Sequence, residues 1–522
     1  MSNTDPSIRP DLRALRERQA LTEDANRPEA VRKRHENGQR TARENINDLC
    51  DPDTFVEYGS LAIAAQKSRQ SIKALRQQSP ADGLVTGIGQ VNGHLFDPEH
   101  SKCIVLSYDY TVMAGTQGAF NHKKTDRMMQ VANTARQPII FFVEGGGGRP
   151  GDTDFYPISV GGLDISTFAA YARLSGKIPR IAIVSGFCFA GNASIAGCSD
   201  VIIATENTSI GMGGPAMIEG GGLGTFRKEE VGPAKDQTLN GVIDILVKDE
   251  TEAVQVAKQY LSYFQGPVAQ WSAADQEGLR DLVPENRKYA YDVKKIIHLL
   301  ADTDSVLELR GPFARNVVTA LARVAGRPVG IMANSTRHLG GAIDSDAADK
   351  LSRFMQLCDA FGLPIISLCD APGFMVGPEA EKQAMVRHAN RLFLTGASLQ
   401  VPILTVVLRK AYGLGAMAMA GGSFWESFFT VSWPSGEFGA MGLEGAVKLG
   451  FKKELAACAT EEEREQLYNQ MVEQAYQKGQ AINAAPVLEF DEVIDPASTR
   501  KWIQTALESI QTHKNERTID AW

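Results

Sequence analysis

KLSRFMQLCDAFGLPII, from Lys350 to Ile366, closely resembles the earlier segment KTDRMMQVANTARQPII, from Lys124 to Ile140. The offset of 350 − 124 = 226 residues holds without a gap, and Lys, Arg, Met, Gln, Pro and two Ile recur in register. This period is far longer than the roughly 20–50 residues of solenoid repeats, and it matches the length of a whole domain. The chain is therefore predicted to contain a duplicated domain.

Other landmarks of the two halves keep nearly the same spacing. Asn334 follows Asp109 by 334 − 109 = 225 residues, and Gly415 follows Gly191 by 415 − 191 = 224 residues. At 522 residues the chain is also longer than one ordinary hydrophobic core requires. Both observations favour two domains of similar architecture.

Each half alternates short buried-strand patterns with helical stretches. The strand patterns PIIFFV and RIAIVSG of the first half correspond to PIISLCD and VPILTVV in the second. Strands alternating with helices are typical of an α/β fold. We predict an N-terminal helical arm and two domains, with boundaries at 1–50, 51–280 and 281–522.

Composition excludes several classes of function. The net charge is −8 and no long basic run appears, so nucleic acid is a poor partner. The apolar runs are too short to span a bilayer, and the N-terminus has no apolar core typical of a signal peptide. Seven cysteines without a CxxC pair indicate a reducing compartment, which predicts the cytoplasm and no membrane partner. His338 and His388 belong to no HExxH-like motif, so no metal site is predicted.

Two glycine-containing turns attract a functional interpretation. SGFCFAGNAS (185–194) and AYGLGAMAMAGG (411–422) each follow a strand pattern and precede a stretch of small residues. Free N–H groups at the start of a helix point outward at the positive end of the helix dipole, and such a nest suits a developing oxyanion. The enolate of a thioester is one example. The same glycines are equally consistent with close packing, which a duplication would copy as well.

The segment EGGGGRPGD (144–152) is not a nucleotide-phosphate loop, because it lacks both GxxxxGK[ST] and GxGxxG. A loop that faces substrate is the better interpretation. Lys123, Lys124 and Arg127 could attract phosphates, although charges on a surface helix are commonly only solvated. No GxSxG motif or defensible Ser–His–Asp set is present, and Met417 is of a residue type that commonly fills cores.

Five segments resemble the carboxyltransferase (β-type) component of biotin-dependent acyl-CoA carboxylases, and the resemblance covers nearly the whole chain. They are GQRTAREN (38–45), SYDYTVMAGTQGAFNHKKTDRMM (107–129), GRPVGIMANSTRHLGGAIDSDAADK (326–350), RFMQLCDAFGLPIISLCDAPGF (353–374) and VRHANRLF with VPILTVVLRKAYGLGAMAMAGG (386–422).

The resemblance implies two tandem crotonase-like domains with ββα superhelix cores, one for acyl-CoA and one for carboxybiotin. It implies an active site built between the first domain of one subunit and the second domain of another, commonly in a hexamer. Carboxybiotin loses CO₂, the freed nitrogen takes the α-proton of the thioester, and the enolate attacks CO₂. Biotin arrives on a partner, so a biotin carboxylase and a biotin carboxyl carrier are the expected partners. Coenzyme A enters as part of the substrate, as in fatty acid metabolism.

Positions carry over from the family through backbone groups. The resemblance places the enolate at Ala190 and Gly191 and the biotin ureido oxygen at Gly415 and Ala416. The residues expected to line the substrates are, on the acyl-CoA side, Gly146, Gly147, Lys123 and Lys124, and, on the biotin side, Gly340 and Gly341, with Met417 in the acyl pocket.

The chain departs from the family at both turns. Propionyl-type members read GPCAGGA at the first turn, where this chain has GFCFAGNA, so Ala190 replaces a glycine and Asn192 an alanine. At the second turn Met417 stands where those members have an aspartate, which implies a changed acyl pocket for acetyl or longer chains. FMVGPEAEKQ resembles a segment of large multidomain acyl-CoA carboxylases, some of which accept long chains.

Three alternatives stay open on sequence alone. A decarboxylase α-subunit would run the same transfer in reverse. A crotonase-type hydratase or isomerase would be expected to place Glu near the first turn, and 185–200 contains none. An assembly subunit without activity would oligomerise but transfer nothing.

Overall fold

The computed structural model describes residues 8–154, 161–512 and 514–521, and it divides into two compact units. Unit 1 contains residues up to Gln265, and unit 2 runs from Gly266 to Asp520. The division lies at 265/266 instead of the predicted 280/281, and the arm over 1–50 is part of unit 1. Among the described residues, no helix is both long and apolar enough to cross a membrane.

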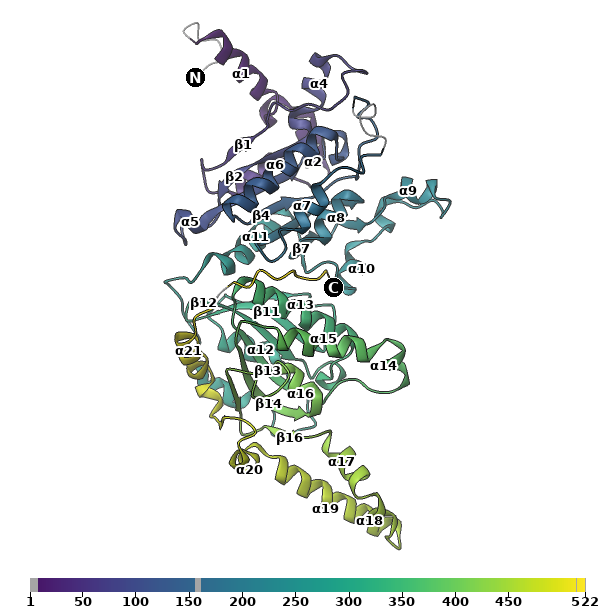
Figure 1. Cartoon of the computed structure of the whole chain (residues 1–522), viewed down its shortest axis with the longest axis vertical. Coiled ribbons are helices and arrows are strands. Elements are labelled where there is room, and N and C mark those ends of the chain that lie inside the picture. The colour runs from purple at the N-terminus through teal and green to yellow at the C-terminus, as the bar shows by residue number, and fades with distance from the viewer. Residues whose placement is uncertain (1–7, 155–160, 513, 522) are drawn as a thin grey trace. The chain divides into compact units, whose positions relative to one another are not determined.

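Unit 1 is built on a seven-stranded sheet (Figure 1). The strands, in spatial order, are β1 (Val56–Tyr58), β2 (Leu84–Gln90), β3 (Lys102–Tyr108), β4 (Ile139–Phe142), β5 (Arg180–Val184), β7 (Val201–Thr205) and β9 (Ile245–Val247). The β1–β2 and β2–β3 pairs are antiparallel and the others parallel. A separate two-stranded sheet pairs β6 (Phe187–Phe189) with β8 (Ser209–Gly211).

The helices of unit 1 connect these strands. They are α1 (Pro10–Ala20), α2 (Pro28–Glu36), α3 (Ala42–Leu49), α4 (Ile72–Gln78), α5 (Pro98–Ser101), α6 (Ala119–Ala135), α7 (Thr167–Ala172), α8 (Gly191–Gly197), α9 (Pro215–Gly220), α10 (Ala234–Leu239) and α11 (Glu250–Gln265). Helix α3 starts with a complete capping box, in which Thr41 and Glu44 bond each other's backbone amides.

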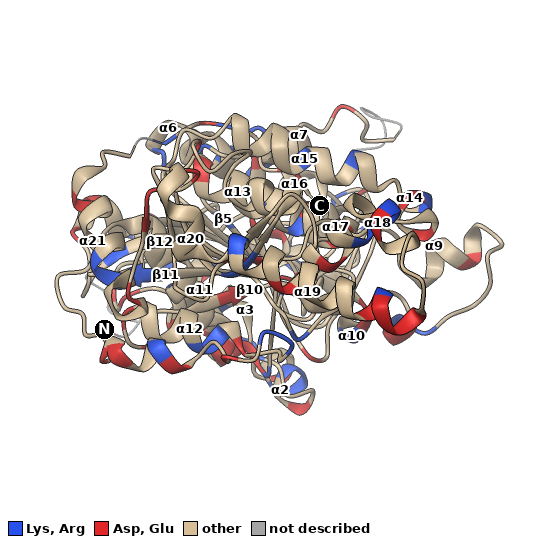
Figure 2. Cartoon of the chain, turned by 90° about the horizontal axis from the view of Figure 1, so that it is seen from below, with Lys and Arg blue, Asp and Glu red and all other residues tan. Residues whose placement is uncertain are grey.

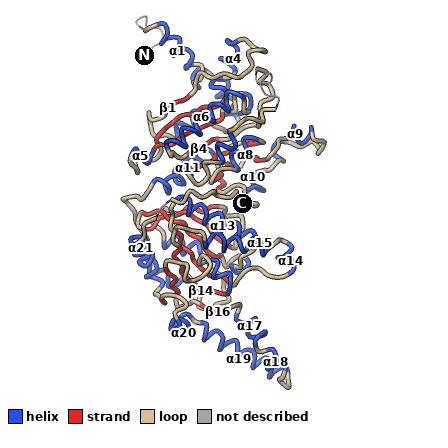
Figure 3. Tube along the Cα trace, in the orientation of Figure 1, coloured by secondary structure: helices blue, strands red, loops and turns tan. Residues whose placement is uncertain are grey.

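Unit 2 repeats the strand order of unit 1 (Figure 3). Its sheet runs β10 (Leu307–Leu309), β11 (Val317–Val324), β12 (Arg327–Asn334), β13 (Ile365–Ala371), β14 (Ile403–Tyr412), β15 (Phe429–Ser432) and β17 (Glu492–Val493). The first two pairs are again antiparallel and the rest parallel. The end of β14 also pairs with β16 (Glu437–Gly439), in the place that the small sheet takes in unit 1.

The helices of unit 2 are α12 (Val293–Leu300), α13 (Ser345–Phe361), α14 (Pro378–Lys382), α15 (Met385–Ala397), α16 (Gly413–Met419), α17 (Leu443–Gly450), α18 (Lys452–Ala456), α19 (Glu461–Gly479), α20 (Ala481–Ala484) and α21 (Thr499–Ser509). The repeated segments of the sequence become α6 with β4 in unit 1 and α13 with β13 in unit 2. The predicted mixed α/β fold is confirmed, and both units have one topology.

Each unit has its own hydrophobic core. The central strands are buried on both faces, as expected for parallel strands covered by helices, so they read as continuous apolar runs. Charged residues of both signs are interspersed along the surface helices (Figure 2). Five of the seven cysteines are buried, whereas Cys198 in unit 1 and Cys458 in unit 2 are partly exposed.

Candidate active site

Three turns meet at the carboxyl ends of the unit 1 strands. They are the turns that lead into α6, follow β4 and start α8. The amide of Gln117 donates to the carbonyl oxygen of Gly147 at 2.7 Å, and the amide of Arg149 donates back to Gln117 at 2.9 Å. The amide of Phe189 bonds the oxygen of Gly145 at 2.9 Å. Backbone hydrogen bonds therefore hold the predicted glycine loop 145–148 against the first nest.

The corresponding turns of unit 2 are joined in the same way. Ile343, at 117 + 226, donates its amide to Gly373 at 3.1 Å, and Met375 donates back to Ile343 at 2.8 Å. Gly415 lies so close to this loop that a Cβ atom on it would be 2.7 Å from the Cα of Gly373. Both predicted nests thus sit in equivalent places, each beside a loop that contains glycine.

Ala190 forms the N-cap of α8 in a strained backbone conformation, with φ 52° and ψ −118°. Its amide is not free, because it donates to the carbonyl oxygen of Gly211 at 3.0 Å. This differs from the prediction that Ala190 and Gly191 both offer their N–H groups. Among the described residues, the amides of Gly191 and Asn192 donate to no protein acceptor, as first-turn amides of a helix do not.

The side chain of Asn192 is fully buried and joins two of the turns. Its Oδ1 accepts the amide of Gly147 at 2.9 Å, and its Nδ2 donates to the oxygen of Gly115 at 3.4 Å. A Cβ atom on Gly145 would lie 2.3 Å from this Nδ2, so only glycine fits there. The asparagine that departs from the family pattern therefore fixes the loop that contains Gly146 and Gly147.

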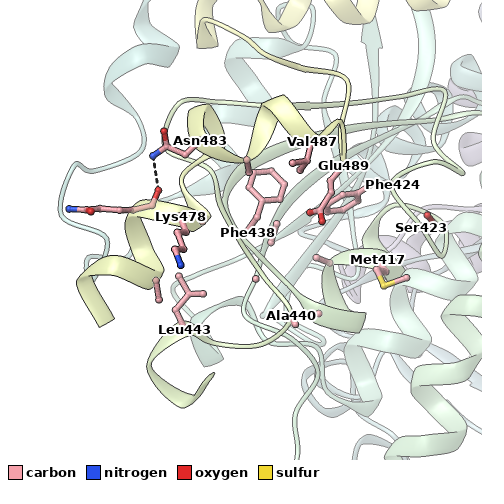
Figure 4. Close-up of a pocket in the computed structure, with 18 of the residues that line it drawn as sticks. Met417, Ser423, Phe424, Phe438, Ala440, Leu443, Lys478, Asn483, Val487 and Glu489 are labelled. Carbon is pink, nitrogen blue, oxygen red and sulfur yellow. Dashed lines mark hydrogen bonds between the residues drawn. The ribbon is translucent and has the colours of Figure 1, made fainter. Parts of the chain in front are cut away.

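The second nest opens onto a cavity of about 1040 Å³ in unit 2. Ala416 and Met417 line it near the start of α16, and Phe424 and Phe438 add aromatic surface. Figure 4 shows Met417, Phe424 and Phe438 around the same space, with Lys478 and Glu489 at other points of its wall. Met417 is 37% exposed and is therefore not the core residue that its type suggests.

Gly340 and Gly341 form the turn that precedes α13, and both have positive φ. A Cβ atom on Gly340 would meet no heavy atom within 4 Å, so this glycine faces open space. A Cβ atom on Gly341 would lie 2.7 Å from the oxygen of Asp370, and the Asn334 amide nitrogen holds the Gly341 oxygen at 2.9 Å. The turn is fixed beside the strand end that leads to Gly373.

A buried carboxylate supports the glycine loop in each unit. Glu144 in unit 1 is paired with Arg34 at 2.8 Å, and Asp370, at 144 + 226, is paired with Arg409 at 3.2 Å and with Lys410 at 2.9 Å. Burial raises the pKa of Glu144 to about 7, against the opposing effect of Arg34. The Arg34–Glu144 pair is a contact that sequence reasoning missed, although the 226-residue offset relates Glu144 to Asp370.

Lys123 and Lys124 have different environments. Lys123 is exposed and its ammonium lies 5.5 Å from the centre of the Phe120 ring. Lys124 is buried, and its Nζ donates to the carbonyl oxygens of Ala81 and Leu84. Its ammonium is directed into the protein, so the expectation that Lys124 contacts a phosphate does not agree with the structure, whereas Lys123 stays available.

The two nests offer backbone donors without a positioned side-chain base. No cluster of three or more metal-ligating side chains occurs among the residues that the structure describes. Donors fixed in this way stabilise charge that develops on a carbonyl-like oxygen. The arrangement suits chemistry in which the reacting partner supplies its own base.

Comparisons with known proteins identify the family. The model of the carboxyl transferase domain matches residues 33–520. The methylmalonyl-CoA carboxyltransferase 12S subunit of Propionibacterium freudenreichii subsp. shermanii is 34% identical over 522 residues, covering 96% of this chain and 94% of the relative. The propionyl-CoA carboxylase beta chain of Saccharopolyspora erythraea is 31% identical, covering 92% and 89% of the two chains.

Solved structures agree. A single-chain, multi-domain long-chain acyl-CoA carboxylase superposes with a TM-score of 0.90 and 55% identity over 96% of this chain. This chain spans about half of that enzyme, or 49% of its length. The transcarboxylase 12S structure superposes with a TM-score of 0.83 and 32% identity, covering 97% and 96% of the two chains.

The chain belongs to the carboxyl transferase domain family and is a carboxyltransferase of the biotin-dependent acyl-CoA carboxylases. The prediction from the five motif segments is thereby confirmed. The alternative of a crotonase-type hydratase or isomerase is not supported.

Proposed function

We propose that the chain transfers a carboxyl group from carboxybiotin on a partner protein to the α-carbon of an acyl-CoA. Carboxybiotin supplies CO₂ by breaking its N–C bond, and the electron pair left on the ureido nitrogen takes the α-proton of the thioester. The carbanion equivalent of the thioester then forms the new C–C bond with CO₂. Each negative charge rests on an oxygen that needs a hydrogen-bond donor.

The amides at the two helix starts supply these donors. In unit 1 we assign the thioester oxygen to the N–H groups of Gly191 and Asn192, because the amide of Ala190 is bonded to Gly211. In unit 2 we assign the ureido oxygen to Gly415 and Ala416. Gly146 and Gly147 would line the acyl-CoA side, and Gly340 and Gly341 the biotin side. The observation that carries this assignment is the equivalent placement of both nests in units of one strand order.

Both units are proposed to be crotonase-like ββα superhelix domains that arose by internal duplication. The shared strand order, the 226-residue offset and the matching turn contacts support this view. We further propose a homo-oligomer in which unit 1 of one copy and unit 2 of another complete each site. The transcarboxylase 12S structure is described as a hexamer assembly, which supports the same number here. Biotin carboxylase and a biotin carboxyl carrier would be its partners in the cytoplasm.

The acyl group is proposed to be long. The structure with 55% identity is described as a long-chain acyl-CoA carboxylase. The cavity next to Met417 is lined by apolar and aromatic side chains that suit a hydrocarbon chain. A charged side chain at position 417 would oppose such a chain, whereas the thioether does not.

The substrate and the direction are tested together. The tagged chain is co-purified with its biotinylated partner and assayed with ATP, bicarbonate and acetyl-, propionyl-, crotonyl- or palmitoyl-CoA. Carboxylation fastest with palmitoyl-CoA is the expected result. A preference for acetyl-CoA would contradict the long-chain assignment, and a complex that only decarboxylates malonyl-type thioesters would assign the reverse direction.

A proline at the second nest tests the site itself. Gly415→Pro removes one amide donor, so biotin-dependent turnover should be lost while acyl-CoA binding is retained. Gly442→Pro is the matched control, because Gly442 already has φ −50° at the N-cap of α17. Unchanged turnover in Gly415→Pro would overturn the assignment.

A further inference from the structure

An unassigned pocket of about 640 Å³ lies in unit 1 beside the edge of its sheet. The first strand β1 and helices α1, α4 and α6 contribute its walls, and Figure 1 shows these elements at one end of the unit. The lining contains six cationic side chains and no carboxylate: Arg18, Lys67, Arg76, Lys123, Lys124 and Arg127. In a chain of net charge −8, such a concentration of one sign requires an explanation.

Five of these cations have no carboxylate partner among the residues that the structure describes. Arg18 donates only to the carbonyl oxygen of Leu61 at 3.2 Å, and Arg127 only to the amide oxygen of Gln130 at 3.3 Å. Lys124 is the exception in another sense, because its ammonium is held by two carbonyl oxygens. Burial, together with the nearby charge of Arg76, lowers the pKa of Arg18. The cations are gathered at a cost that an anion would offset.

The same pocket exposes apolar surface. Tyr58, Leu61 and Ile72 line it and are 36%, 41% and 48% exposed. Phe120 adds a ring with Lys123 above it. A ligand that fits must therefore combine several negative charges with a flat or apolar body, and guanidinium groups favour phosphate because they bind two oxygens at once.

We propose that this basic pocket binds a phosphorylated nucleotide, and that in acyl-CoA it holds the adenine nucleotide with its 3′-phosphate. The N-terminal arm then takes part in substrate binding through Arg18. The assignment to coenzyme A rests on the proposed function, whereas nucleotide binding by the pocket does not.

The sheet geometry allows one ligand to reach both places. The pocket borders β1, and the first nest follows β5, which lies four strand positions away. With strands about 4.8 Å apart, the separation across the sheet is ~19 Å. The pantetheine arm of coenzyme A is an extended, flexible chain of this order. The thioester can therefore lie at Gly191 while the nucleotide lies among the arginines.

Binding is tested by isothermal titration with CoA, 3′-dephospho-CoA, pantetheine and ATP. We expect the full-length wild type to bind CoA about tenfold more tightly than 3′-dephospho-CoA, with a strong salt dependence. The Arg18→Gln/Arg76→Gln variant should lose at least this tenfold. The matched control Arg173→Gln/Lys235→Gln removes two exposed charges of unit 1 elsewhere and should bind as the wild type does.

A kinetic split separates binding from a general structural effect. In the Arg18→Gln/Arg76→Gln variant, KM for acyl-CoA should rise about tenfold with kcat unchanged, and turnover of acyl-pantetheine should not change. Should this variant fold poorly, Lys67→Gln/Lys123→Gln changes only exposed side chains and should weaken CoA binding in the same direction.

The outcomes are distinct. Equal CoA affinity in the wild type and in both pocket variants would overturn the proposal. ATP binding as tight as CoA, lost in the same variants, would confirm a nucleotide pocket but assign it to a free nucleotide. Arginine-dependent CoA binding in a chain that transfers no carboxyl group would leave the pocket standing and overturn the proposed function.

Discussion

Helices α6 and α13 are copies of one element, yet they are used differently. Both have 17 residues, but α13 buries every residue except Asp346, whereas α6 buries only seven. Helix α13 is covered by α15 and by the C-terminal segment, in which Asp520 contacts Gln356. The exposed face of α6 instead borders the basic pocket. Duplication thus kept the position of the helix in the fold and changed what lies over its outer face.

The two nests also differ in how their glycine loops are fixed. In unit 1 the side chain of Asn192 holds the amide of Gly147, whereas in unit 2 the backbone of Gly373 lies directly against Gly415. A side-chain contact can adjust to a substitution, but a backbone contact cannot. The second nest should therefore be the less tolerant of the two.

Adding one methyl group to each nest tests that difference most strongly. In Gly415→Ala the new Cβ would be 2.7 Å from the Cα of Gly373, so we expect transfer to fall by ~10²–10³, as for loss of an oxyanion donor. In Gly191→Ala the closest atom is the Oε1 of Gln117, at the end of a side chain that can move. Initial rates with saturating substrates should show a loss at least tenfold smaller for Gly191→Ala. Equal losses would contradict the comparison.

The acid dependence of stability distinguishes the two supporting carboxylates. Glu144 has a pKa of about 7 in the folded chain against 4.5 as the model value, so it adds stability below about pH 4.5 that is lost as pH rises through 7. The change amounts to about 3 kcal/mol over this window. The difference in Tm between wild type and Glu144→Gln should therefore fall from pH 5 to pH 8. A difference independent of pH would contradict the raised pKa.

The two buried lysines should differ in their contribution to stability. Lys350 donates to the carbonyl oxygens of Arg310, Phe313 and Val317 at 2.8–3.0 Å, and Lys124 reaches only two such oxygens. We expect Lys350→Met to cost about 3 kcal/mol and Lys124→Met about 1–2 kcal/mol, because buried acceptors lose their donor.

The sequence allows the two units to be followed separately. All five tryptophans lie beyond residue 265, so intrinsic fluorescence reports unit 2, and hydrogen exchange of residues 81–84 reports unit 1. Lys350→Met should shift the fluorescence transition, and Lys124→Met should shift only the exchange. Identical shifts of both signals in both variants would show that the units unfold as one.

The smallest effect is expected at Asn192. Asn192→Ala leaves the amide of Gly147 without its acceptor and loosens the loop, which should raise KM for acyl-CoA several-fold and cost about 1 kcal/mol. The KM for the biotinylated partner should not change, because that side belongs to unit 2 in our assignment. Ala416→Ser, at the corresponding helix position, serves as the control in the opposite unit. A change in the partner's KM alone would contradict the assignment.

The repeat in the sequence was sufficient to predict two α/β domains and the positions of both nests. The 226-residue offset relates not only Lys124 to Lys350 but also Gln117 to Ile343, whose loop contacts proved equivalent. The occupied amide of Ala190 could not be predicted, because its acceptor, Gly211, lies on a strand twenty residues away in a separate sheet. The basic pocket was equally hidden, since Arg18, Arg76 and Lys123 come together only through the fold.

The cysteines have a practical consequence. Burial raises the pKa of Cys50, Cys188 and Cys369 and makes these thiols poor nucleophiles, as it does for the other buried ones. Cys198 and Cys458 are left as the two labelling positions, one in each unit. A donor and an acceptor dye attached there would turn the wild-type chain, without any engineered residue, into a molecular ruler that reads inter-unit motion during turnover.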